Sequence, residues 1–334
     1  MKFASLMYFG TVAVSVLSVL WMAGCANLRE RQPAYLSPRS LEDVQKSAPV
    51  SATPANKPRV ALVLGGGGLR GFAHLGVLRA LEDAGIQPDI VVGTSAGAVV
   101  GAAYASGLSP EQIESTARGI KLSSLIDFTF SKSGLMRGDN IARWIDAITA
   151  GVPIENFPRR FAAVATELRS GKAVLLDAGS PGTAVQASAA VPGVNVPLAY
   201  KDGHLVDGGI ASLVPVRFAR AMGADVIVAV DIYCTGPGGD GLAAPSVLLR
   251  VMRVQSCLVA AAEMAEADVL ISPSVSVSGM SAKGEQERAI AAGYDATRAS
   301  LGQIQSHISH FTQGFELKKQ AAAAHAKATL QSAW

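Results

Sequence analysis

Short runs of consecutive apolar residues alternate along the chain with longer segments in which apolar residues recur every three to four positions. The apolar runs are rich in Val, Ile, Leu and Ala and span 59–64, 90–92 and 225–231. Helical patterns span 72–84, 98–105 and 215–222. Short apolar runs bounded by Pro, Gly or Asp are typical of buried strands, above all in parallel sheets. The alternation therefore predicts a layered α/β domain.

The composition supports one core and no nucleic-acid partner. The chain has 334 residues, of which 49% are hydrophobic and 16% charged. This suffices for one sizeable core but not for two. Its 34 Gly and only 10 Phe suit tightly packed α/β layers better than a β-sandwich. The net charge is +3, and no basic cluster is interleaved with aromatic residues. Oligomeric state leaves no sign in the sequence.

The first 24 residues have the features of an export signal. Lys2 precedes a long apolar run, which ends in small residues before Cys25. The segment 22–25 resembles the lipobox of bacterial lipoproteins, in which the cysteine receives a diacylglycerol and becomes the mature N-terminus. We expect a signal peptide over 1–24 and a lipid anchor on Cys25. An uncleaved membrane anchor and a plain signal peptide are the alternatives, and all three place the domain outside the cytoplasm.

The remaining boundaries follow from composition. Residues 25–58 contain five prolines and no sustained apolar period, so we expect a flexible tether there. The catalytic domain is predicted at 59–303, and a C-terminal helical tail at 304–334. Ala26 after the lipidated cysteine, in place of Asp, indicates the periplasmic side of the outer membrane if the source is a diderm bacterium.

The cysteines indicate no metal site. Cys25, Cys234 and Cys257 form neither a CxxC pair nor a Cys/His cluster, and we expect neither a metal nor a cofactor. Cys234 and Cys257 could pair in an oxidising compartment. Isolated cysteines are more often small buried hydrophobic residues, and we favour that state here.

A glycine-rich turn follows the first apolar run. It consists of Gly65, Gly66, Gly67, Gly68, Leu69, Arg70 and Gly71. A strand, such a turn and a helix start bring backbone N–H groups close to an anion. Gly66–Gly71 also fits the dinucleotide pattern GxGxxG, which requires an acidic residue at the end of the next strand. Asp89 begins that strand instead, so the dinucleotide interpretation is disfavoured.

The next strand leads into Gly93-Thr94-Ser95-Ala96-Gly97, which is a G-x-S-x-G motif followed by a helix of small residues. In a nucleophile elbow, a sharp turn of this kind strains the serine and presents its hydroxyl. The helix start also places positive partial charge beside a developing oxyanion. The motif alone is compatible with an ordinary tight turn, but its position between strand and helix favours Ser95 as a nucleophile.

A third motif is Asp207-Gly208-Gly209, which follows His204-Leu205-Val206. An aspartate followed by two glycines is typical of a carboxylate held in a tight turn at the end of a strand. Without the other two motifs, an Asx-type turn with no chemistry would be the better explanation, because such turns are common.

Together, the three motifs resemble the signatures of patatin-like phospholipases, in particular the bacterial members near the neuropathy-target-esterase branch. The likeness extends over about 60–294 and includes 76–85, 134–135, 163–168, 187–193, 215–216 and 268–273. The resemblance implies a three-layer α/β/α domain with a central, mostly parallel sheet. It also implies a Ser–Asp dyad, with Ser95 as nucleophile and Asp207 as proton acceptor. The glycine loop would supply oxyanion donors around Gly67 and Gly68, and Arg70 would orient the loop or a lipid phosphate.

The resemblance implies a lipid acyl hydrolase of the phospholipase or lysophospholipase kind, without metal, acting on membrane lipids. Because a carboxylate in water is a weak base, Asp207 needs a partly desolvated pocket. Ser212 and Asn195 depart from the usual family residues, which leaves the shape of the pocket open. The apolar stretch 122–135 could form a lid or an acyl-chain wall, and a buried helix–loop segment is an equal alternative.

Two other functions are compatible with parts of the sequence. An α/β-hydrolase with a Ser–Asp–His triad needs a histidine after the acid, and the candidates are His307, His310 and His325. A non-catalytic lipid-binding lipoprotein of the cell envelope is the second alternative, and the intact Ser95, Asp207 and glycine loop argue against it.

Overall fold

The computed structural model describes residues 36–47, 57–119, 121–236, 241–276 and 283–332. The chain divides into two units, 1–33 and 34–334, and everything below concerns the second unit. The strands are β1 Arg39–Ser40, β2 Val60–Leu64, β3 Ile90–Thr94, β4 Phe128–Ser131, β5 Gly134–Met136, β6 Arg160–Glu167, β7 Ala173–Leu176, β8 Leu198–Tyr200, β9 Gly203–Asp207, β10 Val226–Val230 and β11 Val269–Ile271. The helices are α2 Leu41–Ser47, α3 Phe72–Asp83, α4 Ala96–Ala105, α5 Pro110–Gly119, α6 Asp139–Ile148, α7 Pro181–Ser188, α8 Val216–Ala221, α9 Ala244–Met264 and α10 Lys283–Ser332.

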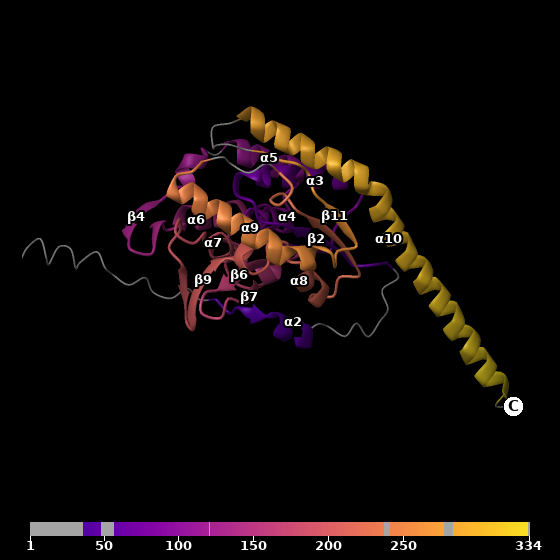
Figure 1. The fold of residues 1–334 in the computed structure, drawn as a ribbon. Helices are drawn as coiled ribbons and strands as arrows, with labels where there is room; N and C mark the ends of the chain where they lie inside the picture. The colour runs from indigo at the N-terminus through magenta and orange to yellow at the C-terminus, as the bar shows by residue number, and fades with distance from the viewer. Residues whose placement is uncertain (1–35, 48–56, 120, 237–240, 277–282, 333–334) are drawn as a thin grey trace, which may run out of the picture. The chain divides into compact units, whose positions relative to one another are not determined.

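In the part of the chain that the structure describes, nine strands form one sheet in the order β1-β7-β6-β3-β2-β10-β11, with β9 paired to β6 and β8 to β9 (Figure 1). The strands from β6 through β3, β2 and β10 to β11 run parallel. The pairs that involve β1, β7, β8 and β9 are antiparallel. Parallel strands end at the same edge of a sheet, so the turns after β2 and β3 lie side by side.

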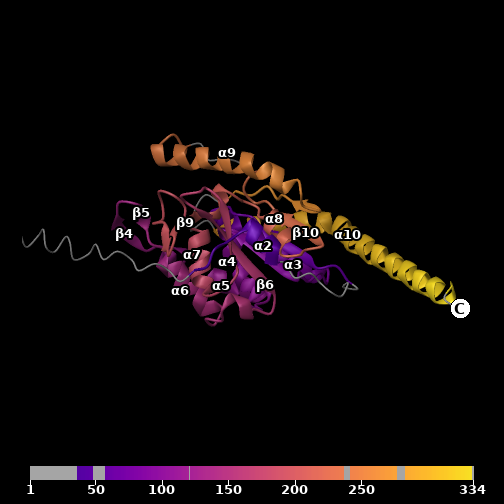
Figure 2. The same cartoon turned by 90° about the horizontal axis from the view of Figure 1, so that it is seen from below.

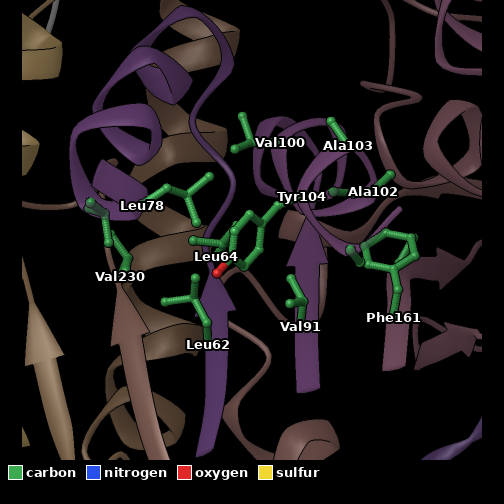
Figure 3. Close-up of a cluster of buried hydrophobic side chains, with 14 of the residues drawn as sticks. Leu62, Leu64, Leu78, Val91, Val100, Ala102, Ala103, Tyr104, Phe161 and Val230 are labelled. Carbon is green, nitrogen blue, oxygen red and sulfur yellow. The ribbon is translucent and has the colours of Figure 1, made fainter. Parts of the chain in front are cut away.

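Helices cover both faces of the sheet. On one face, Leu62, Leu64 and Val91 pack with side chains of α3 and α4, among them Leu78 and Val100 (Figure 3). The other face packs against α2, α8 and α9, as the second hydrophobic cluster shows. The two clusters place these helices on opposite sides of the sheet, and in Figure 2 α9 lies along the upper side of the domain with α5 and α6 below. The predicted three-layer α/β/α architecture with a mostly parallel sheet is confirmed.

The elements around the motifs also agree with the sequence pattern. The apolar runs form β2, β3 and β10, in which every residue is buried. Strands buried on both faces need apolar residues at every position, which explains the continuous runs.

The predicted flexible tether over 25–58 is wrong for residues 36–47. Arg39–Ser40 pairs antiparallel with β7 at the sheet edge, and α2 follows directly. Leu36 and Val44 are buried. A two-residue strand and a seven-residue helix with one buried side chain are too short to produce a periodic signal. The predicted signal peptide, lipobox and Cys25 lie outside the described residues.

The long helix α10 crosses the predicted boundary at residue 303. Its first part packs on α3 with unusually close backbones. A Cβ on Gly76 would lie 1.9 Å from the carbonyl oxygen of Ile290, and one on Gly293 would lie 2.0 Å from that of Ala73. Residues before and after 303 therefore belong to one helix, whose N-terminal part is integral to the domain.

Cys234 and Cys257 form a disulfide with their Cα atoms 5.6 Å apart, so our preference for unpaired cysteines is wrong. The bond ties the segment after β10 to the middle of α9. The local sequence could not predict this pairing, because the two cysteines come together only when α9 packs on the folded domain. None of the described helices is long and apolar enough to span a bilayer.

Candidate active site

Ser95 stands in the turn between β3 and α4 with strained backbone geometry. Its φ of 53° and ψ of −118° lie in a region that non-glycine residues rarely occupy. The neighbouring glycines permit the turn. A Cβ on Gly97 would lie 2.0 Å from the carbonyl oxygen of Leu64, and one on Gly93 would lie 2.4 Å from that of Gly97. This is the elbow geometry that the motif predicts.

A buried serine from another element supports the strained turn. The Ser95 backbone N–H donates to Oγ of Ser188 at 2.9 Å. The Ser188 hydroxyl donates in turn to the carbonyl of Val164, in β6, at 2.6 Å. Ser188 was included only in the family likeness, and no role was predicted for it. Its pairing with Ser95 depends on α7 folding back onto β6, which the local sequence does not reveal.

Asp207 ends β9, where the chain turns tightly. Its Oδ1 accepts the backbone N–H of Gly209 at 2.7 Å, and its carbonyl accepts the Thr166 hydroxyl at 2.9 Å. A Cβ on Gly208 would lie 2.2 Å from the carbonyl oxygen of Val164. The double glycine therefore lets the acid turn sit directly against β6, beside the elbow.

Ser95 and Asp207 meet at this point. The Ser95 hydroxyl is hydrogen-bonded to the Asp207 carboxylate, and each residue is only 8% exposed. Burial raises the pKa of Asp207 from 3.8 to about 6, against the opposing effect of the hydrogen bonds from Ser95 and Gly209. The carboxylate is therefore more basic than an exposed aspartate, as the dyad hypothesis requires.

The glycine loop lies against the same pair. The N–H groups of Gly65 and Gly66 donate to the carbonyls of Val230 and Leu213, each at 3.0 Å. Gly68 has a φ of +57°, a conformation that favours glycine. Within the described residues, no hydrogen bond occupies the backbone N–H of Gly67 or Gly68.

Further contacts fix the loop and the elbow. A Cβ on Gly71 would come within 3.0 Å of Cβ of Ala96, so the loop and the start of α4 are in contact. The Thr94 hydroxyl donates to the carbonyl of Ser212 at 2.9 Å, linking the elbow to the segment after Asp207. Nε2 of the buried His74 donates to the carbonyl of Gly65 at 2.9 Å. Burial lowers the pKa of His74 to about 4, so it is neutral at physiological pH.

A cavity of about 470 Å³ opens onto the dyad. This volume is in the usual range for small-molecule sites. Its lining combines the three motifs with α9 and the neighbouring loop: Gly66, Gly67, Gly68, Leu69, Arg70, Ser95, Val191, Asp207, Gly209, Ile210, Leu213, Tyr233, Gly241, Ser246, Leu249, Arg250, Met252, Arg253 and Ser256. The structure thus brings the predicted glycine loop, Ser95 and Asp207 to one cavity.

Helix α9, for which no role was predicted, forms one wall of this cavity. Its inner residues include Leu249, Met252 and Arg253. Its outer residues are apolar and 40–72% exposed: Val247, Leu248, Val251, Val254, Leu258 and Val259. These outer residues recur three to four positions apart and share one face of the helix. The sequence shows that residues 244–262 are largely apolar, but it does not show which of their side chains face solvent.

The stretch 122–135 does not form the predicted acyl-chain wall. Phe128–Ser131 and Gly134–Met136 make a two-stranded antiparallel ribbon. Phe128 is 82% exposed, so the buried helix–loop alternative is also wrong at this point. No described side chain of the stretch lines the cavity. The segment has enough apolar residues for either prediction, but Phe128 and Leu135 on the ribbon are exposed to solvent.

The competing site hypotheses find no support in the geometry. The Asp89 carboxylate accepts the N–H of Val60 at 2.9 Å, at the start of β2, whereas the glycine loop follows the other end of that strand. It is therefore misplaced for a ribose. No described residue of the cavity lining is a histidine. His307 and His310 are exposed on α10, and the side chain of His325 is outside the described residues.

Comparisons with known proteins agree with the motifs. The family model for patatin-like phospholipase matches residues 62–220. An uncharacterized NTE family protein of Mycobacterium tuberculosis is 36% identical over 211 residues, which cover 61% of this chain and 58% of the relative. Another from the same species is 31% identical over 293 residues, covering 76% of this chain and 50% of the relative. The chain thus matches only about half the length of these relatives.

More distant proteins extend the comparison. Patatin-like phospholipase domain-containing protein 6 of Mus musculus is 36% identical over 181 residues, covering 52% of this chain and 13% of the relative. The crystal structure of VipD from Legionella pneumophila has the same fold, with a TM-score of 0.51 and 16% identity over 84% of this chain and 71% of that one. These findings support the patatin-like phospholipase family for this chain, whose domain has the patatin fold.

Proposed function

We propose that the chain is a serine acyl hydrolase that cleaves carboxylic esters of membrane phospholipids or lysophospholipids. Ser95 is the nucleophile and Asp207 the general base. The observation that carries the proposal is the hydrogen bond between the strained Ser95 and a buried carboxylate whose pKa is raised to about 6. A base of this strength is mostly ionised at neutral pH, yet accepts a proton more readily than an exposed aspartate.

In the acylation step, Oγ of Ser95 bonds to the ester carbonyl carbon while its proton moves to Asp207. The carbonyl electron pair moves onto oxygen and forms a tetrahedral oxyanion. When the carbonyl reforms, the bond to the alcohol oxygen breaks, and that oxygen takes the proton from Asp207. The products of this half-reaction are the free alcohol, which carries the head group, and an acyl-Ser95 ester.

The oxyanion needs hydrogen-bond donors in place before the reaction. The N–H groups of Gly67 and Gly68 are the best candidates, because both residues line the cavity with Ser95 and neither N–H is used within the described fold. The N-terminus of α4 adds positive partial charge at the same place. Loss of one such donor typically costs about 3–4 kcal/mol of transition-state stabilisation.

Hydrolysis of the acyl-enzyme uses the same two residues in reverse. A water molecule gives a proton to Asp207 as its oxygen bonds to the acyl carbon. The oxygen of Ser95 then leaves and recovers the proton, which releases a fatty acid. The chain's own residues suffice for every proton transfer in this cycle.

Action at a lipid surface is supported by α9. The helix that walls the cavity exposes an apolar outer face, and it has no acidic residue between 244 and 262. An apolar face with arginines nearby suits the headgroup region of a bilayer. The proposed lipid anchor on Cys25 would hold the domain there. The Cys234–Cys257 disulfide is consistent with an oxidising compartment such as the periplasm.

The proposal is tested with vesicles of mixed phospholipids and lysophospholipids and mass spectrometry of the products. Wild type should release fatty acids together with the matching lysophospholipids and glycerophosphodiesters, whereas Ser95→Ala should release none. A fluorophosphonate probe should label wild type but not Ser95→Ala. Absence of both labelling and release in folded wild-type protein would exclude the hydrolase and favour a binding role.

A further inference from the structure

His74 is the only buried histidine in the part of the chain that the structure describes, and it donates a hydrogen bond to the glycine loop. It is the third residue of α3 and has no solvent exposure. Its Nε2 lies 2.9 Å from the carbonyl oxygen of Gly65. Because a carbonyl can only accept, the hydrogen of the neutral ring lies on Nε2, and Nδ1 carries none. The side chain thus acts as a single uncharged donor directed at the loop.

This hydrogen bond helps to hold one peptide group from both ends. The carbonyl of Gly65 and the N–H of Gly66 belong to the same peptide plane. The carbonyl accepts from His74, and the N–H donates to the carbonyl of Leu213 at 3.0 Å. The preceding N–H, that of Gly65, donates to the carbonyl of Val230 at 3.0 Å. The contacts therefore fix the orientation of a plane that two glycines would otherwise leave free to turn.

The Gly65–Gly66 peptide lies between the nucleophile and the candidate oxyanion donors. A Cβ on Gly66 would lie 3.4 Å from Cβ of Ser95, so this part of the loop packs directly against the elbow. The next two amides along the chain are those of Gly67 and Gly68, whose N–H groups no hydrogen bond occupies within the described residues. Successive peptide planes are joined by only two soft torsions at each Cα, so turning the first plane redirects these N–H groups.

The backbone that carries His74 is itself held in place. A Cβ on Gly293, in α10, would lie 2.0 Å from the carbonyl oxygen of Ala73, and one on Gly76 would lie 1.9 Å from that of Ile290. These two close contacts flank His74 and leave the start of α3 no room to shift toward α10. The imidazole therefore links the glycine loop to a fixed part of the domain.

Packing alone does not explain a histidine at this position. Nδ1 of His74 is buried and has no hydrogen-bond partner among the described residues. A buried polar atom without a partner destabilises the fold, and a leucine of similar volume would avoid that cost. Burial also lowers the pKa of the ring to about 4, so His74 brings no positive charge to the site at neutral pH. The donor on Nε2 is the property that an apolar residue could not supply.

We propose that His74 is a positioning residue of the oxyanion site: its hydrogen bond to Gly65 sets the direction of the N–H groups of Gly67 and Gly68. This inference rests on the proposed hydrolase function, in which those groups stabilise the oxyanion. His74 is absent from the described lining of the cavity and acts only through the loop. Because the oxyanion forms in the transition state and not in the bound ester, loss of this hydrogen bond should lower kcat and leave KM nearly unchanged.

Three substitutions of His74 separate the donor from the space that the ring fills. The amide nitrogen of glutamine reaches the position of Nε2, whereas that of asparagine reaches only the position of Nδ1. For a soluble p-nitrophenyl ester, His74→Gln should keep kcat within about threefold of wild type, whereas His74→Asn and His74→Leu should each lower it about tenfold or more. Leu81→Val is the matched control: it is buried on the same helix and should lower the melting temperature without changing kcat.

A transition-state analogue gives a readout that a purely structural role would not change. When Oγ of Ser95 bonds to the carbonyl carbon of a trifluoromethyl ketone, its proton moves to Asp207 and the carbonyl electron pair moves onto oxygen. The oxyanion of this adduct needs the same N–H donors as the reaction. Its inhibition constant should therefore rise in parallel with the fall in kcat for His74→Asn and His74→Leu. The corresponding trifluoromethyl alcohol, which cannot form the adduct, should inhibit all variants equally.

Nitrogen-15 NMR of wild type tests the geometry without any variant. One histidine should keep the neutral Nε2–H form at about pH 5, where an exposed imidazole is protonated. Absence of this signal would overturn the role of His74, and so would wild-type kcat in folded His74→Leu. An equal fall of kcat in His74→Gln and His74→Leu would also overturn it, because the donor would then not matter. Failure of wild type to hydrolyse the ester would instead overturn the hydrolase function.

Discussion

The hydroxyl of Ser212 donates a 2.8 Å hydrogen bond to Oε2 of Glu263 and thereby joins the segment after Asp207 to α9. The other carboxylate oxygen accepts the backbone N–H of Arg217 at 3.0 Å. Glu263 is buried, and burial raises its pKa. Because the carbonyl of Ser212 also accepts the Thr94 hydroxyl, one chain of hydrogen bonds runs from α9 to the elbow.

We expect Glu263→Ala to destabilise the protein by about 1–3 kcal/mol, because it leaves the buried Ser212 hydroxyl and the partly buried N–H of Arg217 without an acceptor. Glu263→Gln should cost less, since its amide oxygen can still accept one of the two hydrogen bonds. Glu266→Ala is the matched control: Glu266 pairs with Arg217 at the surface and should contribute less than about 1 kcal/mol. Urea unfolding measures all three variants, and equal losses for Glu263→Ala and Glu266→Ala would contradict the assignment.

The pH profile should report the ionisation of Asp207. Only the carboxylate can accept the proton of Ser95, and its pKa is raised to about 6. We expect kcat/KM for a soluble uncharged ester to rise about tenfold per pH unit below this value and to level off above it. A profile that stays flat from pH 4.5 to 7 would show that the base is a different group or that Asp207 is not buried in solution.

Asp207→Asn should be inactive and, at pH 8, more stable than wild type. Since burial raises the folded-state pKa from 3.8 to about 6, the protonated carboxyl favours the folded state. That stability is fully present below pH 3.8 and is lost as the pH rises through 6, by up to about 3 kcal/mol. Asparagine does not ionise, so its advantage should grow between pH 4 and pH 7. Thermal unfolding of both proteins at pH 4 and pH 7 measures this advantage. An equal difference in stability at the two pH values would contradict the raised pKa of Asp207.

Ser188→Ala should lower the rate of fluorophosphonate labelling of Ser95 about tenfold or more. The substitution leaves the Ser95 N–H without its acceptor and frees a strained turn whose geometry aims the nucleophile. Ser180→Ala provides the control on the same helix. It removes the N-cap of α7 and should cost about 1 kcal/mol of stability while leaving the labelling rate near that of wild type.

Local sequence patterns predicted the parts of the fold that follow directly from local chemistry. The continuous apolar runs and the glycines around Ser95 and Asp207 are imposed by burial and by close backbone contacts, so the strands, the elbow and the acid turn were predictable. A raised pKa for Asp207 was also predictable, because a carboxylate that accepts the proton of Ser95 must be more basic than an exposed one.

The remaining features depend on where distant segments come together. Ser188 reaches Ser95 through α7, Cys234 reaches Cys257 through α9, and Arg39–Ser40 joins the sheet edge in two residues. None of these contacts produces a period or a motif in the chain. The inner and outer faces of α9 are both largely apolar, so its pattern could not show which one lines the cavity.

The contact between α3 and α10 predicts that Gly→Ala substitutions in these helices will change stability in opposite directions, depending on the position. Gly76→Ala and Gly293→Ala should each destabilise the protein by about 1–3 kcal/mol or more, because the new methyl group would meet backbone that cannot move aside. Gly302→Ala should stabilise α10 by about 0.5–1 kcal/mol, since nothing lies within 4 Å of its added Cβ. Thermal unfolding of the three variants tests the contrast, and a Gly76→Ala protein as stable as wild type would contradict it.

The position of β10 determines how far the chain can be shortened. The matched family segment ends at residue 220, before this strand, which lies in the interior of the sheet between β2 and β11. A recombinant fragment that stopped there would leave the whole length of β2 as a bare edge, open to pairing with a second molecule. It would also lose Ile304, a fully buried residue of α10. Truncations meant to keep the sheet and its helical cover complete should therefore extend past that residue.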